Sequence, residues 1–136
     1  MRSMRSILLI VCIGMAGSTL AAELAAGWTH SVAVRDGRVW TWGDNAYGQL
    51  GQPDAGRALC PRPVAGLDGV TAVSAAWHTL AVTRDGHVYA WGRNDLGQLG
   101  NGRCGIGEKS YELVRVDGLE HIVAVAAGWD HSLALA

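Results

Sequence analysis

The sequence contains no phenylalanine, and only 3 prolines and 3 cysteines occur among its 136 residues. Neither sign of charge dominates, because 11 Lys and Arg residues stand against 12 Asp and Glu residues. A domain that neutralises several phosphates needs a basic surface, so this balance argues against a nucleic-acid partner. The length is that of one ordinary domain.

Motifs that carry chemistry are also missing. The sequence has no nucleophile elbow, zincin helix or phosphate-binding loop, and no Asn-x-Ser/Thr sequon. We therefore expect no catalytic residue, no metal site and no cofactor, and we predict that the protein is not an enzyme.

No apolar run reaches the length of about eighteen residues that spans a bilayer. The apolar run at residues 7–16 follows Arg2 and Arg5 and precedes small residues at positions 21 and 22. That order is typical of a cleavable export signal, so we predict a signal peptide over residues 1–22 and a secreted or periplasmic mature chain. An uncleaved membrane anchor is the alternative.

Glycine and tryptophan, in contrast, are abundant, with 19 and 6 copies. The interior of a helical domain rarely tolerates so much backbone entropy. The composition therefore favours short strands joined by many turns.

A unit of about fifty residues repeats along the chain. The segment DGRVWTWGDNAYGQLG at residues 36–51 recurs as DGHVYAWGRNDLGQLG at residues 85–100, an offset of 49 (85 − 36). A second motif occurs at residues 26–34, 75–82 and 127–135, and its middle copy is one residue shorter before the histidine. We place the repeats at residues 25–73, 74–125 and 126–136.

Each unit contains short extended runs, for example residues 70–73, 78–82 and 88–91. Asp-Gly between apolar runs predicts a hairpin with a primed turn, because Gly accepts the positive φ that this turn needs. The first Asp-Gly pair comes six residues after its motif histidine (36 − 30), and the second comes seven residues after its own (85 − 78). A one-residue slip inside a strand would invert its faces, so we expect the extra residue to lie in the turn.

The motifs Ala-Gly-x-x-His-Ser-Leu-Ala-Leu and Asp-Gly-x-Val-Tyr-x-Trp-Gly-x-Asn-x-x-Gly-Gln-Leu-Gly resemble the regulator of chromosome condensation repeat family. The resemblance covers residues 25–136 and implies an all-β propeller, which in complete members has seven four-stranded blades and binds other proteins. A mature chain of 114 residues (136 − 22) leaves a partial β-propeller of about two blades plus a remnant. We interpret it as a fragment of a longer propeller, and self-association through exposed blade faces is the alternative.

Several recurring residues are expected to serve the scaffold, because catalysis needs a unique site rather than a periodic one. The histidines should begin strands and form hydrogen bonds within each blade. Residues 131–135 alternate large with small and carry no charge after His131, so both faces of this strand should be buried between blades. The tryptophans at the ends of matching strands should contribute much of the contact between blades. The scaffold set comprises His30, His78, His131, Asp36, Gly37, Asp85, Gly86, Trp42 and Trp91.

A second set of tryptophans lies beside the motif histidines, on predicted bends that would share one rim of a propeller. Tryptophan is enriched in binding hot spots, and an exposed indole also suits stacking on sugars. The alternative is that each ring folds between blades as core. The candidate partner-binding residues are Trp28, Thr29, Trp77, Trp129 and Asp130.

We therefore expect a non-catalytic repeat module for protein–protein interaction. Carbohydrate or cell-envelope binding by the same tryptophans is a second hypothesis. Guanine-nucleotide exchange, the activity of the family's founding member, is a third, which export would disfavour. Cys60 and Cys104 lie in equivalent irregular stretches, and after export they would either form a disulfide or remain two unpaired thiols.

Overall fold

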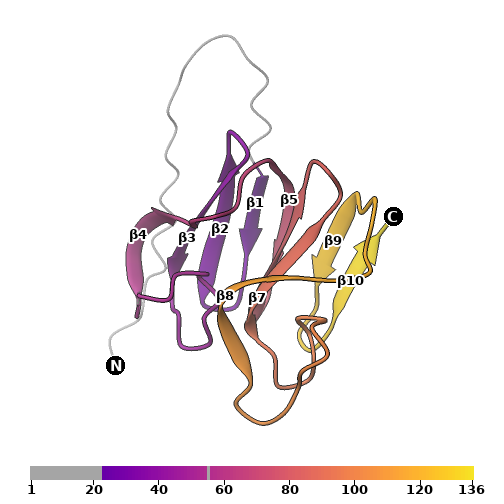
Figure 1. Cartoon of the computed structure of the whole chain (residues 1–136). Coiled ribbons are helices and arrows are strands. Elements are labelled where there is room, and N and C mark those ends of the chain that lie inside the picture. Colours follow the sequence, from indigo (N-terminus) through magenta and orange to yellow (C-terminus); the bar gives the residue numbers. More distant parts are fainter. Residues whose placement is uncertain (1–22, 55) are drawn as a thin grey trace, which may run out of the picture.

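The computed structural model describes residues 23–54 and 56–136, which form strands and turns (Figure 1). The predicted signal peptide, residues 1–22, lies outside the described residues. In the part of the chain that the structure describes, no helix is long and apolar enough to cross a membrane.

The described strands form three antiparallel sheets. Their bounds are β1 Glu23–Ala26, β2 His30–Arg35, β3 Arg38–Gly43, β4 Ala58–Pro63, β5 Val70–Ala75, β6 His78–Thr83, β7 Val88–Arg93, β8 Lys109–Arg115, β9 Ala124–Ala127 and β10 Ser132–Leu135. The sheet orders are β1-β2-β3-β4, β5-β6-β7-β8 and β10-β9. We call the first sheet blade 1, the second blade 2 and the two-stranded sheet the partial blade. This architecture confirms the predicted all-β fold.

The sheets stand side by side, as consecutive blades of a propeller do. The first strand of each sheet is innermost, and β5 contacts both β1 and β9 (Figure 1). β4 and β8 are the outer edges of their blades. The blades begin at residues 23, 70 and 124, so the predicted repeat boundaries after residues 73 and 125 fall inside β5 and β9.

The two Asp-Gly hairpins differ in their turns. In blade 1, Asp36 (φ 53°) and Gly37 (φ 74°) both have positive φ, and Arg35 pairs with Arg38. This is the two-residue type I′ loop that the sequence predicts. In blade 2, the Thr83 amide donates to the His87 carbonyl at 3.0 Å around a three-residue loop, in which Gly86 has positive φ (80°) and Asp85 does not. The primed turn is therefore confirmed for Asp36-Gly37 and is wrong for Asp85-Gly86. The extra residue therefore lies in the turn, as predicted.

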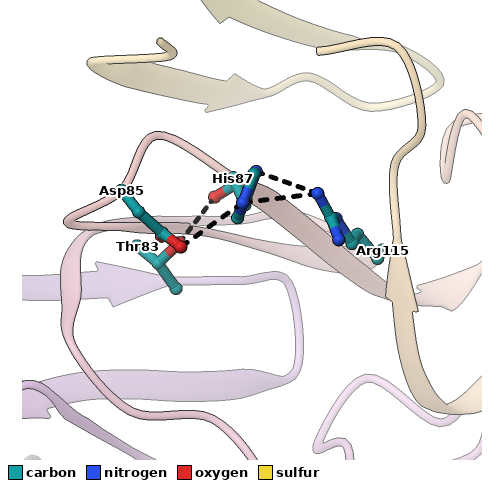
Figure 2. Close-up of polar contacts among 4 residues, drawn as sticks. All are labelled: Thr83, Asp85, His87 and Arg115. Atoms are coloured by element: carbon teal, nitrogen blue, oxygen red, sulfur yellow. Dashed lines mark hydrogen bonds and ion pairs between the residues drawn. The ribbon is translucent and has the colours of Figure 1, made fainter. Parts of the chain in front are cut away.

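Side chains tie the blade 2 hairpin to the outer strand (Figure 2). The Thr83 hydroxyl donates to the Asp85 carboxylate, and this hydrogen bond lowers the pKa of Asp85. His87 Nε2 lies 3.3 Å from Asp85 Oδ2, while Arg115 Nη2, from β8, lies 3.2 Å from His87 Nδ1. The contacts give Asp85 a structural role at the turn.

The turn glycines also contact the next blade. The Gly37 carbonyl accepts a hydrogen bond from the Val70 amide at 2.9 Å, and the Gly86 carbonyl accepts one from the Ile122 amide at 3.2 Å. A Cβ on Gly86 would lie 2.8 Å from His121 Cα, which is closer than atoms can approach. Glycine is therefore required at this turn by its positive φ and by the neighbouring backbone.

Burial follows the number of neighbouring blades. All six residues of β6, which lies between blade 1 and the partial blade, are buried. The prediction that residues 131–135 are buried on both faces is wrong, because Leu133 and Leu135 are 61% and 62% exposed. Only blade 2 covers this strand within the described part of the chain.

The matching tryptophans Trp42 and Trp91 differ in the same way. Trp91 is fully buried at the interface of blades 1 and 2, where it packs in a core cluster with Val32, Val39 and Val64. Trp42 is only half-buried, since the described residues place no blade before blade 1. The predicted contribution to blade packing is confirmed for Trp91 and not for Trp42.

We predict that Trp91→Ala lowers the free energy of unfolding by about 3–5 kcal/mol, because it leaves a large cavity between blades. Trp42→Ala should lower it by about 1 kcal/mol or less, since the ring is partly exposed. Urea unfolding followed by circular dichroism measures both. Equal losses would contradict the asymmetry between the two blade faces.

Candidate functional site

The motif histidine of blade 1 forms a hydrogen bond with blade 2. His30 Nε2 lies 2.8 Å from the Thr79 hydroxyl on β6, and that hydroxyl donates to the Gln49 carbonyl at 2.8 Å. The indole Nε1 of Trp91 donates to the same carbonyl at 2.9 Å. We call these four residues the interblade node. It joins two residues of blade 1 to two of blade 2.

The arrangement recurs one blade later. His78 Nε2 lies 2.7 Å from the Ser132 hydroxyl on β10, and Ser132 donates to the Gln98 carbonyl at 2.6 Å. The prediction that the histidines form hydrogen bonds within each blade is therefore wrong for His30 and His78. Both connect a blade to the following one, and His131, which has no described blade beyond it, is exposed.

These hydrogen bonds fix the tautomers of His30 and His78. Thr79 gives its single proton to Gln49, so it accepts a hydrogen bond from His30 Nε2 and leaves Nδ1 unprotonated. The Nδ1 atoms of His30 and His78 are buried and have no hydrogen-bond partner among the described residues. Burial, followed by repulsion from the next motif histidine, lowers the pKa of each imidazole to about 4. Both rings are neutral at pH 7.

Residues that we did not single out from the sequence hold the node in place. Asn45 Oδ1 accepts from the Leu50 amide at 2.9 Å, and Gln49 Oε1 accepts from the Tyr47 amide at 2.9 Å. Asn94 and Gln98 make the same contacts in blade 2. Their signal was their recurrence in the Trp-Gly-x-Asn-x-x-Gly-Gln-Leu-Gly motif.

The lowered pKa of the histidines predicts a stability loss in acid. The unfolded chain binds a proton at the ordinary pKa of 6.5, and the folded chain only near 4. The stability is therefore fully present above pH 6.5 and is lost as the pH falls toward 4. We expect a loss of up to about 3 kcal/mol per histidine.

Urea unfolding at pH 7, 6, 5 and 4.5 measures this dependence. His30→Gln, which keeps a donor for Thr79, should flatten the slope between pH 6.5 and 4.5. His121→Gln is the matched control, because His121 is exposed and should leave the slope unchanged. A His30→Gln slope equal to that of the parent would contradict the assignment.

Removing the Thr79 hydroxyl should lower the free energy of unfolding. Thr79→Val preserves the shape of the side chain but leaves the His30 donor without its acceptor, and we expect a loss of about 1–3 kcal/mol in the free energy of unfolding. Thr71→Val, at an exposed threonine of β5, is the control and should change it by less than about 0.5 kcal/mol. Similar values for both variants would argue against the node.

The bend tryptophans gather into one cluster. The ring centroids of Trp28 and Trp77 are 5.7 Å apart, those of Trp28 and Trp129 4.9 Å, and those of Trp77 and Trp129 5.8 Å. The three rings line a hollow of about 240 Å³ together with alanine and glycine residues at the ends of β1, β5 and β9. We call this the aromatic cluster. The inner strands of three consecutive sheets thus carry indoles to one rim.

Exposure distinguishes the members of the aromatic cluster. Trp28 and Trp129 are 63% and 52% exposed, so neither ring is folded between blades as core. Trp77 is half-buried, and Tyr47 packs edge-on against it with centroids 5.6 Å apart. The two outer indoles therefore present their surfaces to solvent.

A cation also packs against the cluster. The Arg93 guanidinium is 5.8 Å from the ring centroids of both Tyr47 and Trp77. A hydrogen bond with Asp95 raises the pKa of Arg93, and Arg93 Nε donates to Asp95 Oδ2 at 2.9 Å. Cation–π contact holds the aromatic rings of blades 1 and 2 together.

Of the remaining predicted site residues, two lie beside the aromatic cluster and the two cysteines lie apart from each other. Thr29 and Asp130 are exposed beside Trp28 and Trp129, and the Thr29 hydroxyl accepts a hydrogen bond from Gln49 Nε2 at 3.3 Å. Cys60, on β4, and Cys104, in the loop before β8, are exposed free thiols. Of the two alternatives, a disulfide or two unpaired thiols, the structure therefore shows the unpaired thiols.

Four-stranded antiparallel blades that pack side by side through a periodic node define the class of repeat propellers. The family model "Regulator of chromosome condensation (RCC1) repeat" matches residues 36–82 and 85–135, and a second model of the same description matches residues 22–49 and 70–98. The chain belongs to the RCC1 repeat family.

Solved structures show the same fold. Prp20p of Saccharomyces cerevisiae is 30% identical, with a TM-score of 0.73 over 88% of this chain and 30% of its own. Yeast RCC1 (Prp20) bound to Kap60 is 26% identical, with a TM-score of 0.71 over 84% of this chain and 29% of its own. Human WBSCR16, 23% identical, has a TM-score of 0.74 over 89% of this chain and 32% of its own.

The chain thus spans about a third of the length of the solved proteins that it matches. No curated protein sequence matches it significantly.

Proposed function

We propose that the chain is a non-catalytic protein-binding module that engages its partner through the aromatic cluster. The observation that carries the proposal is the exposure of Trp28 and Trp129 beside the half-buried Trp77. Large, partly exposed indoles on a rigid support are typical of binding hot spots. We further propose that the module is part of a longer propeller and acts after export.

Contact with the partner would use the outer faces of the indoles. The ring centroids are 4.9–5.8 Å apart, so the rings contact one another and their remaining outer surfaces are the part open to a partner. Contacts with Tyr47 and Arg93 hold Trp77, so this side chain loses little conformational freedom on binding. Such a surface suits an apolar or aromatic patch on a folded protein.

The family supports a protein as the class of partner. Prp20p binds Gsp1p and histones, and yeast RCC1 (Prp20) forms a complex with Kap60. Two of the recurring histidines, His30 and His78, which an enzyme could use as bases, are neutral and form hydrogen bonds across the blade interfaces. We therefore assign the histidines to the scaffold and the aromatic cluster to recognition.

The test begins with cross-linking of the purified chain to exported proteins of its source and identification of the captured partner by mass spectrometry. Calorimetry then compares the parent with the Trp28→Ala/Trp129→Ala double variant. We expect affinity to fall by about tenfold or more, since hot-spot truncations commonly have this effect. Circular dichroism should not change, because both rings are exposed.

Leu59→Ala is the control, since Leu59 is an apolar residue on β4 that is even more exposed (84%), at the outer edge of blade 1. It should keep the affinity of the parent. Unchanged affinity in the double variant, or loss of its fold, would contradict the proposal. A glycan-array signal that the double variant abolishes would support the carbohydrate hypothesis instead.

A further inference from the structure

Charged side chains stand beside the aromatic cluster at equivalent positions of blades 1 and 2. Asp44 follows the motif glycine of β3, and Arg93 follows that of β7. The Asp44 amide donates to the Thr29 carbonyl at 2.9 Å, and the Arg93 amide donates to the Trp77 carbonyl at 3.3 Å. The same backbone position therefore carries an anion beside the bend of Trp28 and a cation beside the bend of Trp77.

The carboxylate of Asp44 has no counter-ion among the described residues. It accepts hydrogen bonds from two neutral donors, the Ala46 amide at 3.3 Å and Gln49 Nε2 at 3.2 Å. Lys109 reaches the same loop, but its ammonium donates to the Ala46 carbonyl at 3.1 Å and forms no ion pair with a described carboxylate. The negative charge of Asp44 is therefore left unpaired.

A second unpaired carboxylate lies beside the bend of the partial blade. Asp130 directly follows Trp129, is exposed, and forms no ion pair with a described residue. After the larger effect of the hydrogen bond with Asp95, the charge of Asp130 also raises the pKa of Arg93. Asp130 therefore lies on the same rim as the rings that Arg93 contacts.

Arg93 shows how a guanidinium is held on this rim. Its central carbon is 5.8 Å from the ring centroids of both Tyr47 and Trp77, and its Nε donates to Asp95 Oδ2 at 2.9 Å. A guanidinium is planar, so it can lie on an aromatic ring while its N–H groups donate to a carboxylate. An aromatic ring and a nearby carboxylate are thus the two groups that hold an arginine here.

The two exposed indoles offer the same pair of groups. Asp44 lies beside the bend of Trp28, and Asp130 is next to Trp129; both rings are more than half exposed. The hollow of about 240 Å³ between the indoles is otherwise lined by alanine and glycine, so no side chain of its wall is charged. Because the unpaired charges beside it are both negative, the complementary group on a partner is a cation.

We propose that the aromatic cluster recognises an arginine of its protein partner. The guanidinium lies on the exposed indoles of Trp28 and Trp129 and donates to the Asp130 carboxylate, while the charge of Asp44 adds to the attraction. The inference rests on the proposed protein-binding role of the cluster, and it adds the chemistry of the residue that the partner supplies.

The probe is the blocked peptide Gly-Arg-Gly, titrated into the isotope-labelled full chain and followed by the indole N–H signals in NMR spectra. We expect the signals of Trp28 and Trp129 to shift in a saturable way and that of the buried Trp91 to stay in place. The same peptide with citrulline, the neutral isostere of arginine, should bind about fivefold more weakly or worse. Absence of saturable shifts, or equal binding of both peptides, would overturn the proposal.

Charge-neutral variants of the chain locate the site. Asp44→Asn/Asp130→Asn should reduce the preference for the arginine peptide to about twofold or less, because it removes both charges. Asparagine keeps an oxygen for the Ala46 amide, so the variant should fold, and circular dichroism checks this. Asp117→Asn is the matched control, at an exposed aspartate that follows β8. A double variant that keeps the preference, or a control that loses it, would overturn the proposal.

The captured partner separates this inference from the proposed function. Calorimetry should show that the double aspartate variant binds the partner about fivefold more weakly and with a smaller dependence on salt, because two charges are lost. Affinity that depends on Trp28 and Trp129 but not on Asp44 and Asp130 would overturn arginine recognition and leave the proposed function standing.

Discussion

The structure depends on the hydrogen bonds at the Thr79 hydroxyl. Successive blades share no sheet, so side chains and a few loop amides must join them. Thr79 accepts from His30 and donates to the Gln49 carbonyl, to which Trp91 also donates. These groups are buried, where an unpaired donor or acceptor would cost about 1–3 kcal/mol. The node is therefore satisfied only when two blades stand in one relative position, and it sets the angle at which the next blade packs.

The same arrangement of hydrogen bonds recurs between blade 2 and the partial blade. Ser132 takes the place of Thr79 in the next interface, and the same spacing brings the bend tryptophans to one rim. Faces that no blade covers among the described residues are open, which explains the half-buried Trp42 and the exposed Leu133. In a repeat protein, stability comes from each unit together with its contacts to the next. The same regularity separates the roles of the repeated residues: those inside each interface support the fold, and those on the rim form the surface that we propose for binding.

The local sequence was enough to predict the repeat, the β-strands, the Asp-Gly hairpins and the position of the extra turn residue, because turn chemistry and alternation are local. The fourth strand was taken from the family resemblance, since β4 contains Pro61 and Pro63 and alternates poorly. The partner of His30 could not be predicted, because Thr79 lies 49 residues away and periodicity does not say which blade supplies a contact. The tryptophans were placed correctly on bends, but their mutual contacts depend on the closeness of three inner strands. The function and the export of the chain stay predictions.

The central claim is that the interblade node makes blades 1 and 2 one cooperative unit. Native-state hydrogen exchange at increasing urea tests it most directly, with the amides of Val32 in β2 and Leu80 in β6 as reporters of the two blades. The account predicts that their opening free energies converge on one value, equal to that of global unfolding, and that Thr79→Val separates them. Independent opening of Val32 and Leu80 in the parent chain would contradict it.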